Sequence, residues 1–173
     1  LLTALLVTGC AGGPKLTDLR VGYAPVNGLR LYYEVHGKPN GRPPLLLLHG
    51  GDPCWETSFS EVMPLLVQSR QVIAFDQAGH GRTADRNAPF TFRQSADDAA
   101  ALLEYLKVPQ ADWYGYSNGG GIAIEGALRH PRMVRRIVFQ SSVWSKQGSP
   151  AAFWKGFDKA RLADMPAEFK RAY

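Results

Sequence analysis

The chain has 173 residues and a mass of 19.0 kDa, which suits one compact domain better than two. Hydrophobic residues make up 45% and charged residues 20% of it, so the composition excludes a disordered or a collagen-like protein. The net charge is +5, but lysine and arginine are spread along the sequence without a basic run, so nucleic acid is not an expected partner. Two cysteines, Cys10 and Cys54, are too few for a disulfide framework, a redox pair or a zinc site, and neither a metal nor a cofactor is expected.

The first ten residues are apolar and finish in small side chains before Cys10. This pattern is typical of the later part of a signal peptide. Residues 7–10, Val-Thr-Gly-Cys, resemble the bacterial lipobox, in which the cysteine carries lipid and becomes the mature N-terminus. A plain secretory cleavage site and an N-terminal core strand are the alternatives. The lipobox predicts a protein of the bacterial cell envelope, held on a membrane through lipidated Cys10, whereas simple cleavage predicts a secreted or periplasmic protein.

Residues 11–19 contain Gly-Gly-Pro and are predicted to form a tether. Two alternating runs follow, at 21–25 and 29–36, and an Asn-Gly pair separates them. Both residues of that pair tolerate positive φ, so the runs predict an antiparallel hairpin. The unbroken run of four leucines at 45–48 predicts a strand that is buried on both faces.

Helical and extended patterns alternate through the rest of the chain. The predicted helices are 59–67, 92–106 and 119–130, and the predicted strands are 71–75, 111–114 and 134–140. This alternation predicts a mainly parallel sheet with helices on both faces. After Ser141 the pattern changes, and residues 150–173 are predicted to form helices with exposed aromatic side chains, namely Phe153, Trp154 and Phe157.

The segment from Gly115 to Gly119 has the pattern Gly-x-Ser-x-Gly and lies between a predicted strand and a predicted helix. A serine in such a turn has a strained backbone and a hydroxyl that is exposed above the sheet. Glycines are needed two residues before and two residues after this serine, because a Cβ at either position would meet the neighbouring strand and helix. The N-terminus of the next helix faces the place where an oxyanion would develop. Ser117 is therefore the candidate nucleophile; a phosphate-binding turn, the alternative, would need glycine patterns that this segment lacks.

Three motifs in this order resemble those of the α/β-hydrolase family, over about residues 21–142. The His-Gly-Gly motif that ends at Gly51 is similar to the family's oxyanion loop. The resemblance implies that the backbone N–H groups of Gly51 and Asn118 are the oxyanion donors. Residues 76–83 match the family's D-x-x-G-x-G-x-[ST] loop, which is structural in most members. The resemblance also implies the α/β-hydrolase fold, with a mostly parallel sheet, helices on both faces and a helical cap.

A serine hydrolase of this fold needs an acid and then a histidine after the nucleophile in the chain. The only later histidine in the sequence is His130, which lies on the same predicted helix, roughly 17 Å away at about 1.5 Å per residue. His49, beside the predicted oxyanion loop, is expected to pack and to form hydrogen bonds rather than to catalyse. We therefore expect the triad acid and histidine beyond Tyr173, in a longer protein.

These patterns predict three segments: a signal remnant, lipobox and tether at 1–19, the N-terminal part of a hydrolase core at 20–145, and the start of a helical cap at 146–173. Such a piece would leave a sheet edge and an apolar face uncovered. We therefore expect the 173 residues alone to be inactive, and to be unstable or to aggregate.

The expected activity of the full-length protein is hydrolysis of a small or medium-sized carboxylic ester through an acyl-enzyme on Ser117. A serine nucleophile argues against the family's epoxide hydrolases and haloalkane dehalogenases, which use a carboxylate. Lactonase, amidase, carbon–carbon hydrolase and perhydrolase chemistry on the same site are alternatives. A non-catalytic, membrane-anchored protein that binds a small molecule is a further alternative.

Overall fold

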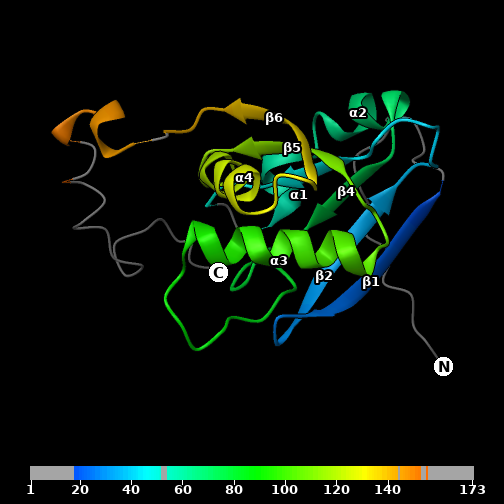
Figure 1. Ribbon diagram of the computed structural model, residues 1–173, viewed down its shortest axis with the longest axis horizontal. Helices are drawn as coiled ribbons and strands as arrows, with labels where there is room; N and C mark the ends of the chain where they lie inside the picture. The colour runs from blue at the N-terminus through cyan, green and yellow to red at the C-terminus, as the bar shows by residue number, and fades with distance from the viewer. Residues whose placement is uncertain (1–17, 52–53, 144, 153–154, 156–173) are drawn as a thin grey trace.

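Six strands form one sheet in the order β1-β2-β4-β3-β5-β6 in the computed structural model, which describes residues 18–51, 54–143, 145–152 and 155 (Figure 1). The strands are β1 (Leu19–Val26), β2 (Leu29–His36), β3 (Leu45–Leu48), β4 (Val72–Phe75), β5 (Ala111–Tyr116) and β6 (Val134–Gln140). The helices are α1 (Trp55–Phe59), α2 (Met63–Ser69), α3 (Phe92–Tyr105), α4 (Asn118–Arg129) and the 3-10 turn η1 (Lys146–Gly148).

The last four strands run parallel, and β1 and β2 add an antiparallel pair at one side. From β3, the chain goes first to β4 on one side and later to β5 on the other. In open α/β sheets, ligands bind beyond the carboxyl ends of the strands at such a reversal of strand order. The α/β class and the mostly parallel sheet that the sequence predicts are confirmed.

The antiparallel hairpin is confirmed, with Val26 paired to Leu29 across a two-residue turn. Asn27 and Gly28 have φ values of 48° and 78°, which is the positive region that a type I′ turn requires of both central residues.

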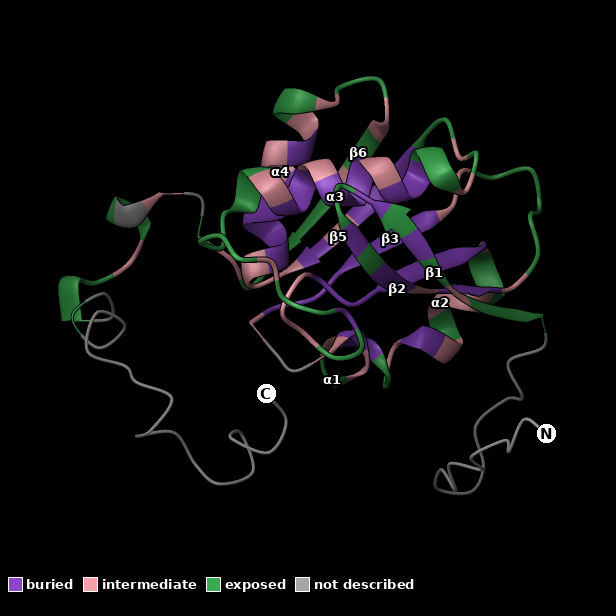
Figure 2. Cartoon of the chain, turned by 90° about the horizontal axis from the view of Figure 1, so that it is seen from below, coloured by how far each residue is buried: buried purple, intermediate pink, exposed green. Residues whose placement is uncertain are grey.

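β3 is covered on both sides, as its run of leucines predicts. Leu46 and Leu48 belong to the core cluster beneath α3 and α4, whereas Leu45 and Leu47 belong to a second cluster with α1. Successive side chains of a strand point to opposite faces, so one apolar run serves both cores. Figure 2 shows α1 and α2 on one face of the sheet and α3 and α4 on the other.

The single helix predicted at 59–67 is wrong, because the chain forms two helices there. α1 ends at Phe59, and α2 begins at Met63 with a proline in its first turn, Pro64. Proline lacks an N–H and crowds the preceding turn, so it starts a helix more readily than it continues one. The other helices and strands predicted between residues 21 and 140 lie within two residues of their observed bounds.

Some predicted features lie outside the described residues. These include Cys10, the lipobox, most of the tether and the three aromatic residues Phe153, Trp154 and Phe157 of the predicted cap. Within the described part of the chain, no helix is long and apolar enough to cross a membrane.

Candidate active site

Ser117 occupies a sharp turn between the end of β5 and the start of α4, with φ 52° and ψ −118°. A positive φ costs a non-glycine residue about 1–2 kcal/mol, so the surrounding structure must hold this conformation. The N–H of Ser117 donates to the Gln140 carbonyl oxygen on β6 at 3.0 Å, and the Ser117 carbonyl oxygen accepts from the Gly120 N–H at 2.9 Å. The strained strand-to-helix turn predicted from the sequence is present.

The two glycines of the motif let α4 lie directly against the sheet. A Cβ on Gly115 would lie 2.2 Å from the Gly119 carbonyl oxygen, inside the helix backbone. A Cβ on Gly119 would lie 1.9 Å from the Leu48 carbonyl oxygen at the end of β3. Both distances are far below van der Waals contact, so any side chain at either position would push α4 away and move Ser117.

The loop after β3 lies beside the residue that follows Ser117. A Cβ built on Gly51 would lie 3.0 Å from Nδ2 of Asn118, so the backbone of the loop lies against the Asn118 side chain. The Gly50 N–H donates to Ser58 Oγ at 3.1 Å, which ties the loop to α1. The two residues that the family resemblance names as oxyanion donors are therefore neighbours in space.

His49 is fully buried beneath this loop and is held by backbone groups. Its Nε2 accepts the Gln77 N–H at 3.0 Å, so Nε2 carries no proton and the hydrogen bonds assign a neutral ring protonated at Nδ1. That Nδ1–H donates to the Gly50 carbonyl oxygen at 2.8 Å, and the Gln77 amide donates to the His49 carbonyl oxygen at 2.8 Å. This is the packing and hydrogen-bonding position that the sequence predicts for His49.

The 76–83 loop forms a buried ionic joint between β4 and α1. Asp76 is fully buried and accepts the Trp55 N–H at 3.1 Å and the backbone N–H and Nε of Arg82 at 2.9 and 2.7 Å. Arg82 also donates twice to Glu56, at 2.6 and 2.7 Å, and although burial opposes its charge, these carboxylates raise its pKa. Gly81 has φ +50°, and a Cβ there would lie 2.3 Å from Asp76 Oδ2. The loop fixes the position of α1 behind the site.

A buried polar row on β2 continues this joint. Tyr32 donates to Glu34 at 2.5 Å, His36 Nε2 lies 2.9 Å from the other Glu34 oxygen, and Arg82 stacks over the Tyr32 ring at 3.9 Å. Burial favours a raised pKa for Glu34, but the close approach of His36 and the hydrogen bond from Tyr32 outweigh it and lower the pKa. The sequence reasoning missed this row. The sequence does contain a sign of it: the three residues are spaced two apart along one predicted strand, so their side chains lie on the same face.

A series of rings leads from the buried histidine to the first turns of α4. The ring centroids are 5.1 Å apart for His49 and His80, 6.4 Å for His80 and Phe90, and 5.8 Å for Phe90 and Phe92. A Cβ on Gly121 would lie 2.5 Å from the Phe92 ring, so this ring packs on α4 just after the nucleophile turn. Phe90 and Phe92 are 48% and 38% exposed, which makes an apolar surface at this side of the site.

His130 lies at the opposite end of α4 from Ser117. Its Nε2 is 2.7 Å from Oδ1 of Asp97, and a hydrogen bond from Arg129 is the main cause that lowers the pKa of Asp97. Among the residues that the structure describes, no histidine forms a hydrogen bond with the Ser117 hydroxyl. The same residues contain no group of three or more histidine, cysteine, aspartate or glutamate side chains that could hold a metal ion. Cys54 is a partly exposed thiol 3.5 Å from Thr57 Oγ1.

Comparisons with known proteins place these features in a family. The chain is 41% identical over 104 residues to the 2-hydroxymuconate semialdehyde hydrolase of Pseudomonas sp. (strain CF600), covering 57% of this chain and 36% of that protein. It is 31% identical over 156 residues to the proline iminopeptidase of Clostridioides difficile (strain 630), covering 87% of this chain and 50% of that protein.

A solved structure described as an N-acyl homoserine lactone degrading enzyme matches with a TM-score of 0.66 and 29% identity, covering 79% of this chain and 52% of that one. The chain thus spans about half the length, or less, of these proteins. A model of the alpha/beta hydrolase fold family matches residues 43–173, which is most of the chain. With the nucleophile turn, the glycine loop after β3 and the strand order all in agreement, the chain belongs to the α/β-hydrolase fold family.

Proposed function

We propose that the full-length protein is a serine hydrolase that cleaves a small or medium-sized carboxylic ester through an acyl-enzyme on Ser117. The observation that carries the proposal is the strained turn of Ser117 at the carboxyl end of β5, where Gly51 and Asn118 are neighbours in space. The similarity to two hydrolytic enzymes of the family supports it.

In the proposed reaction, Ser117 Oγ attacks the ester carbonyl carbon while a histidine takes the serine proton. The carbonyl oxygen becomes an oxyanion and accepts hydrogen bonds from the N–H groups of Gly51 and Asn118. One such donor contributes roughly 3 kcal/mol to the transition state. The ester C–O bond then breaks, the alcohol leaves with the proton from the histidine, and water releases the acid from the serine. The histidine and its acid partner are assigned to the protein beyond Tyr173.

The proposal includes a place in the cell. Cys10 carries lipid and holds the enzyme on a membrane of the bacterial envelope. Replacement of this residue, Cys10→Ala, is expected to move the protein from the membrane fraction to the soluble fraction of its host. Unchanged partition of the variant would contradict the anchor and would leave the proposed chemistry untouched.

A second candidate substrate class has a specific observation in its favour. The 41% identity to a 2-hydroxymuconate semialdehyde hydrolase extends over 104 residues. Hydrolysis of such a semialdehyde would use the same serine and the same backbone donors. Parallel assays of a p-nitrophenyl ester and of 2-hydroxymuconate semialdehyde on the full-length protein decide between them by kcat/KM.

The decisive test is labelling with a fluorophosphonate probe, which reacts with activated serines. We expect one label on the full-length protein, located by peptide mass spectrometry at Ser117, and none on Ser117→Ala. The matched control is Ser69→Ala, at the exposed end of α2, which should label like the wild type. A folded wild-type protein that takes no label would contradict the proposal and favour the non-catalytic binding protein.

A further inference from the structure

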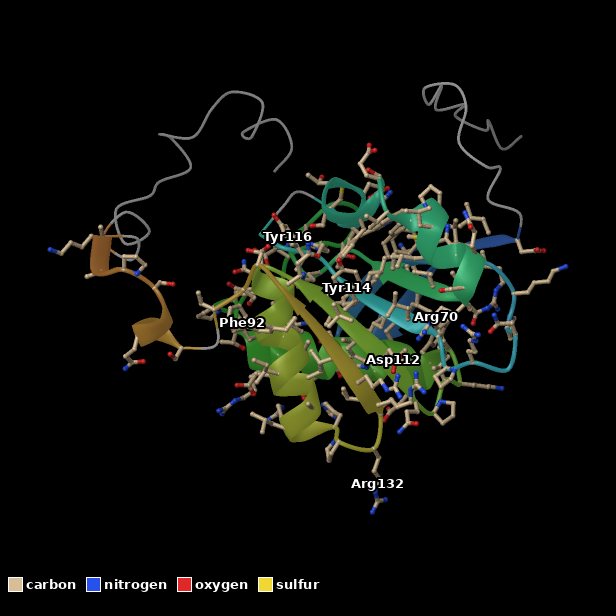
Figure 3. The ribbon with its side chains drawn as sticks, turned by 90° about the horizontal axis from the view of Figure 1, so that it is seen from above. Arg70, Phe92, Asp112, Tyr114, Tyr116 and Arg132 are labelled. Atoms are coloured by element: carbon tan, nitrogen blue, oxygen red, sulfur yellow. The ribbon has the colours of Figure 1, made fainter. Side chains whose placement is uncertain are left out.

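Cationic side chains gather at the amino ends of the parallel strands, at the edge of the sheet opposite Ser117. They come from the start of β1, the β2–β3 loop, the end of α2, the α3–β5 loop, the turn before β6 and the start of β6. We define the basic edge by seven of them: Arg20, Lys38, Arg42, Arg70, Lys107, Arg132 and Arg135. Figure 3 labels Arg70 and Arg132 at this end of the molecule and Tyr116, which precedes the nucleophile, at the other.

Few carboxylates oppose these cations. Asp18 pairs with Lys38 at 3.5 Å, and Asp112 is held between Arg70 and Arg135 at 2.5 and 2.6 Å. Glu104, in the last turn of α3, is the third acid near this edge. Seven cations and three carboxylates give the basic edge a net charge of +4, compared with a net charge of +5 for the whole chain.

Four of the seven cations have no acidic partner within 4 Å among the described residues, and all four are exposed; they are Arg20, Arg42, Lys107 and Arg132. Three of these, Arg20, Arg42 and Lys107, line one open hollow of about 550 Å³ together with Val108 and Pro109. A cationic rim around an apolar wall suits a phosphate group that carries a glycerol and the start of an acyl chain.

We propose that the basic edge is a docking surface for a membrane that contains anionic lipid. The proposal rests on the proposed lipid at Cys10, which lies only eight residues before Asp18 in the sequence. Asp18 is at the basic edge, and eight residues reach at most about 28 Å when fully extended. An anchor there would keep this edge within reach of the bilayer surface. Each lysine or arginine close to an anionic surface strengthens binding about five-fold.

This orientation sets the direction of the active site. Ser117 lies at the carboxyl ends of the strands, and the basic edge lies at their amino ends. With the basic edge on the bilayer, the site opens away from the membrane. The substrate is therefore a water-soluble ester, taken from the aqueous compartment rather than from the lipid beneath the enzyme.

The test uses the full-length protein with Cys10→Ala, so that the surface is measured without the anchor. Its binding to vesicles of phosphatidylglycerol mixed with phosphatidylcholine is compared with binding to phosphatidylcholine alone. We expect binding to the anionic vesicles only, and weakening as salt rises, because the Debye length falls to about 8 Å at about 0.15 M. Loss of two cations in Arg42→Glu with Lys107→Glu is expected to weaken binding at least 25-fold, at about five-fold for each cation.

The matched control has the same change in net charge at the other end of the molecule. Arg30 and Arg93 are exposed residues at the starts of β2 and α3, and Arg30→Glu with Arg93→Glu should keep most of the binding. Turnover of a soluble p-nitrophenyl ester on the same samples reports the proposed function separately. The proposal would be overturned if the protein did not bind anionic vesicles at low salt, or if both double variants lost vesicle binding equally. It would also be overturned if the protein bound duplex DNA more tightly than the vesicles.

Discussion

The two ends of the parallel strands are built in different ways. At the carboxyl ends, the site depends on the absence of side chains, since Gly115 and Gly119 leave no room for a Cβ and Ser117 holds a strained backbone. At the amino ends, exposed side chains such as Arg42 and Lys107 determine the surface, and a Cβ on Gly41 would meet nothing within 4 Å. The carboxyl end, where Ser117 lies, is therefore expected to lose stability with even a small added side chain. The amino end, which carries the basic edge, is expected to tolerate added side chains, but its binding should depend on charge.

The largest expected effect on stability is at the carboxyl ends of the strands. Gly119→Ala puts a methyl group 1.9 Å from the Leu48 carbonyl oxygen, and neither backbone can move without the other elements. We expect a loss of at least about 3 kcal/mol in the free energy of unfolding, measured with urea on the full-length protein. Gly41→Ala at the amino end is the control; it has φ +81° with nothing within 4 Å, so it should lose only about 1 kcal/mol. Equal losses would remove the contrast between the two ends.

Asp112 differs from the exposed side chains at the amino ends of the strands, because it is buried between two arginines. Asp112→Asn leaves Arg70 and Arg135 without their counter-charge and is expected to cost about 2 kcal/mol at pH 7. A hydrogen bond from Arg135 is the first cause that lowers the pKa of Asp112.

The sign of its pH dependence follows from that lowered pKa. The stabilisation is present above the unfolded pKa of about 3.9 and is lost as pH falls through the lower folded pKa. Urea unfolding of wild type and Asp112→Asn should therefore converge in acid. A difference in stability that stays constant down to about pH 3 would contradict this assignment.

Ser117→Gly tests the strain at the nucleophile turn. Glycine accepts positive φ freely, so the release of about 1–2 kcal/mol exceeds the roughly 0.5–1 kcal/mol that its extra freedom costs in the unfolded chain. We expect the variant to be more stable than the wild type by about 0.5 kcal/mol, without fluorophosphonate labelling. Ser117→Ala keeps a Cβ in the same turn and should lose the label without gaining that stability. A loss of stability in the glycine variant would show that the turn is not strained.

The smallest expected effect on folding is at the basic edge. Arg42→Ala with Lys107→Ala should change the free energy of unfolding by less than about 0.5 kcal/mol, because both side chains are exposed and without acidic partners in the described structure. Thermal unfolding of the full-length protein measures this. A large loss would mean that these side chains support the fold rather than a surface.

Local patterns explain what could be predicted. The leucine run of β3, the Asn-Gly turn and the spacing of glycines around Ser117 each act through neighbours in the sequence, so a single chain contains the signal. The break between α1 and α2 was missed because apolar spacing continues across it, although Pro64 marks it. The basic edge could not be seen, because its members are spread through the chain and only the strand order brings them to one end.

The hydrogen bond from His49 to Gly50 also acts on the next residue of the loop. The Gly50 carbonyl and the Gly51 N–H belong to one planar trans peptide unit, so they point in opposite directions. By holding that carbonyl at 2.8 Å, the buried ring fixes the direction of the N–H on the other side of the plane. Donation to the carbonyl also polarises the amide and strengthens its N–H as a donor. A neutral imidazole thus aims and tunes the proposed oxyanion donor from beneath the loop.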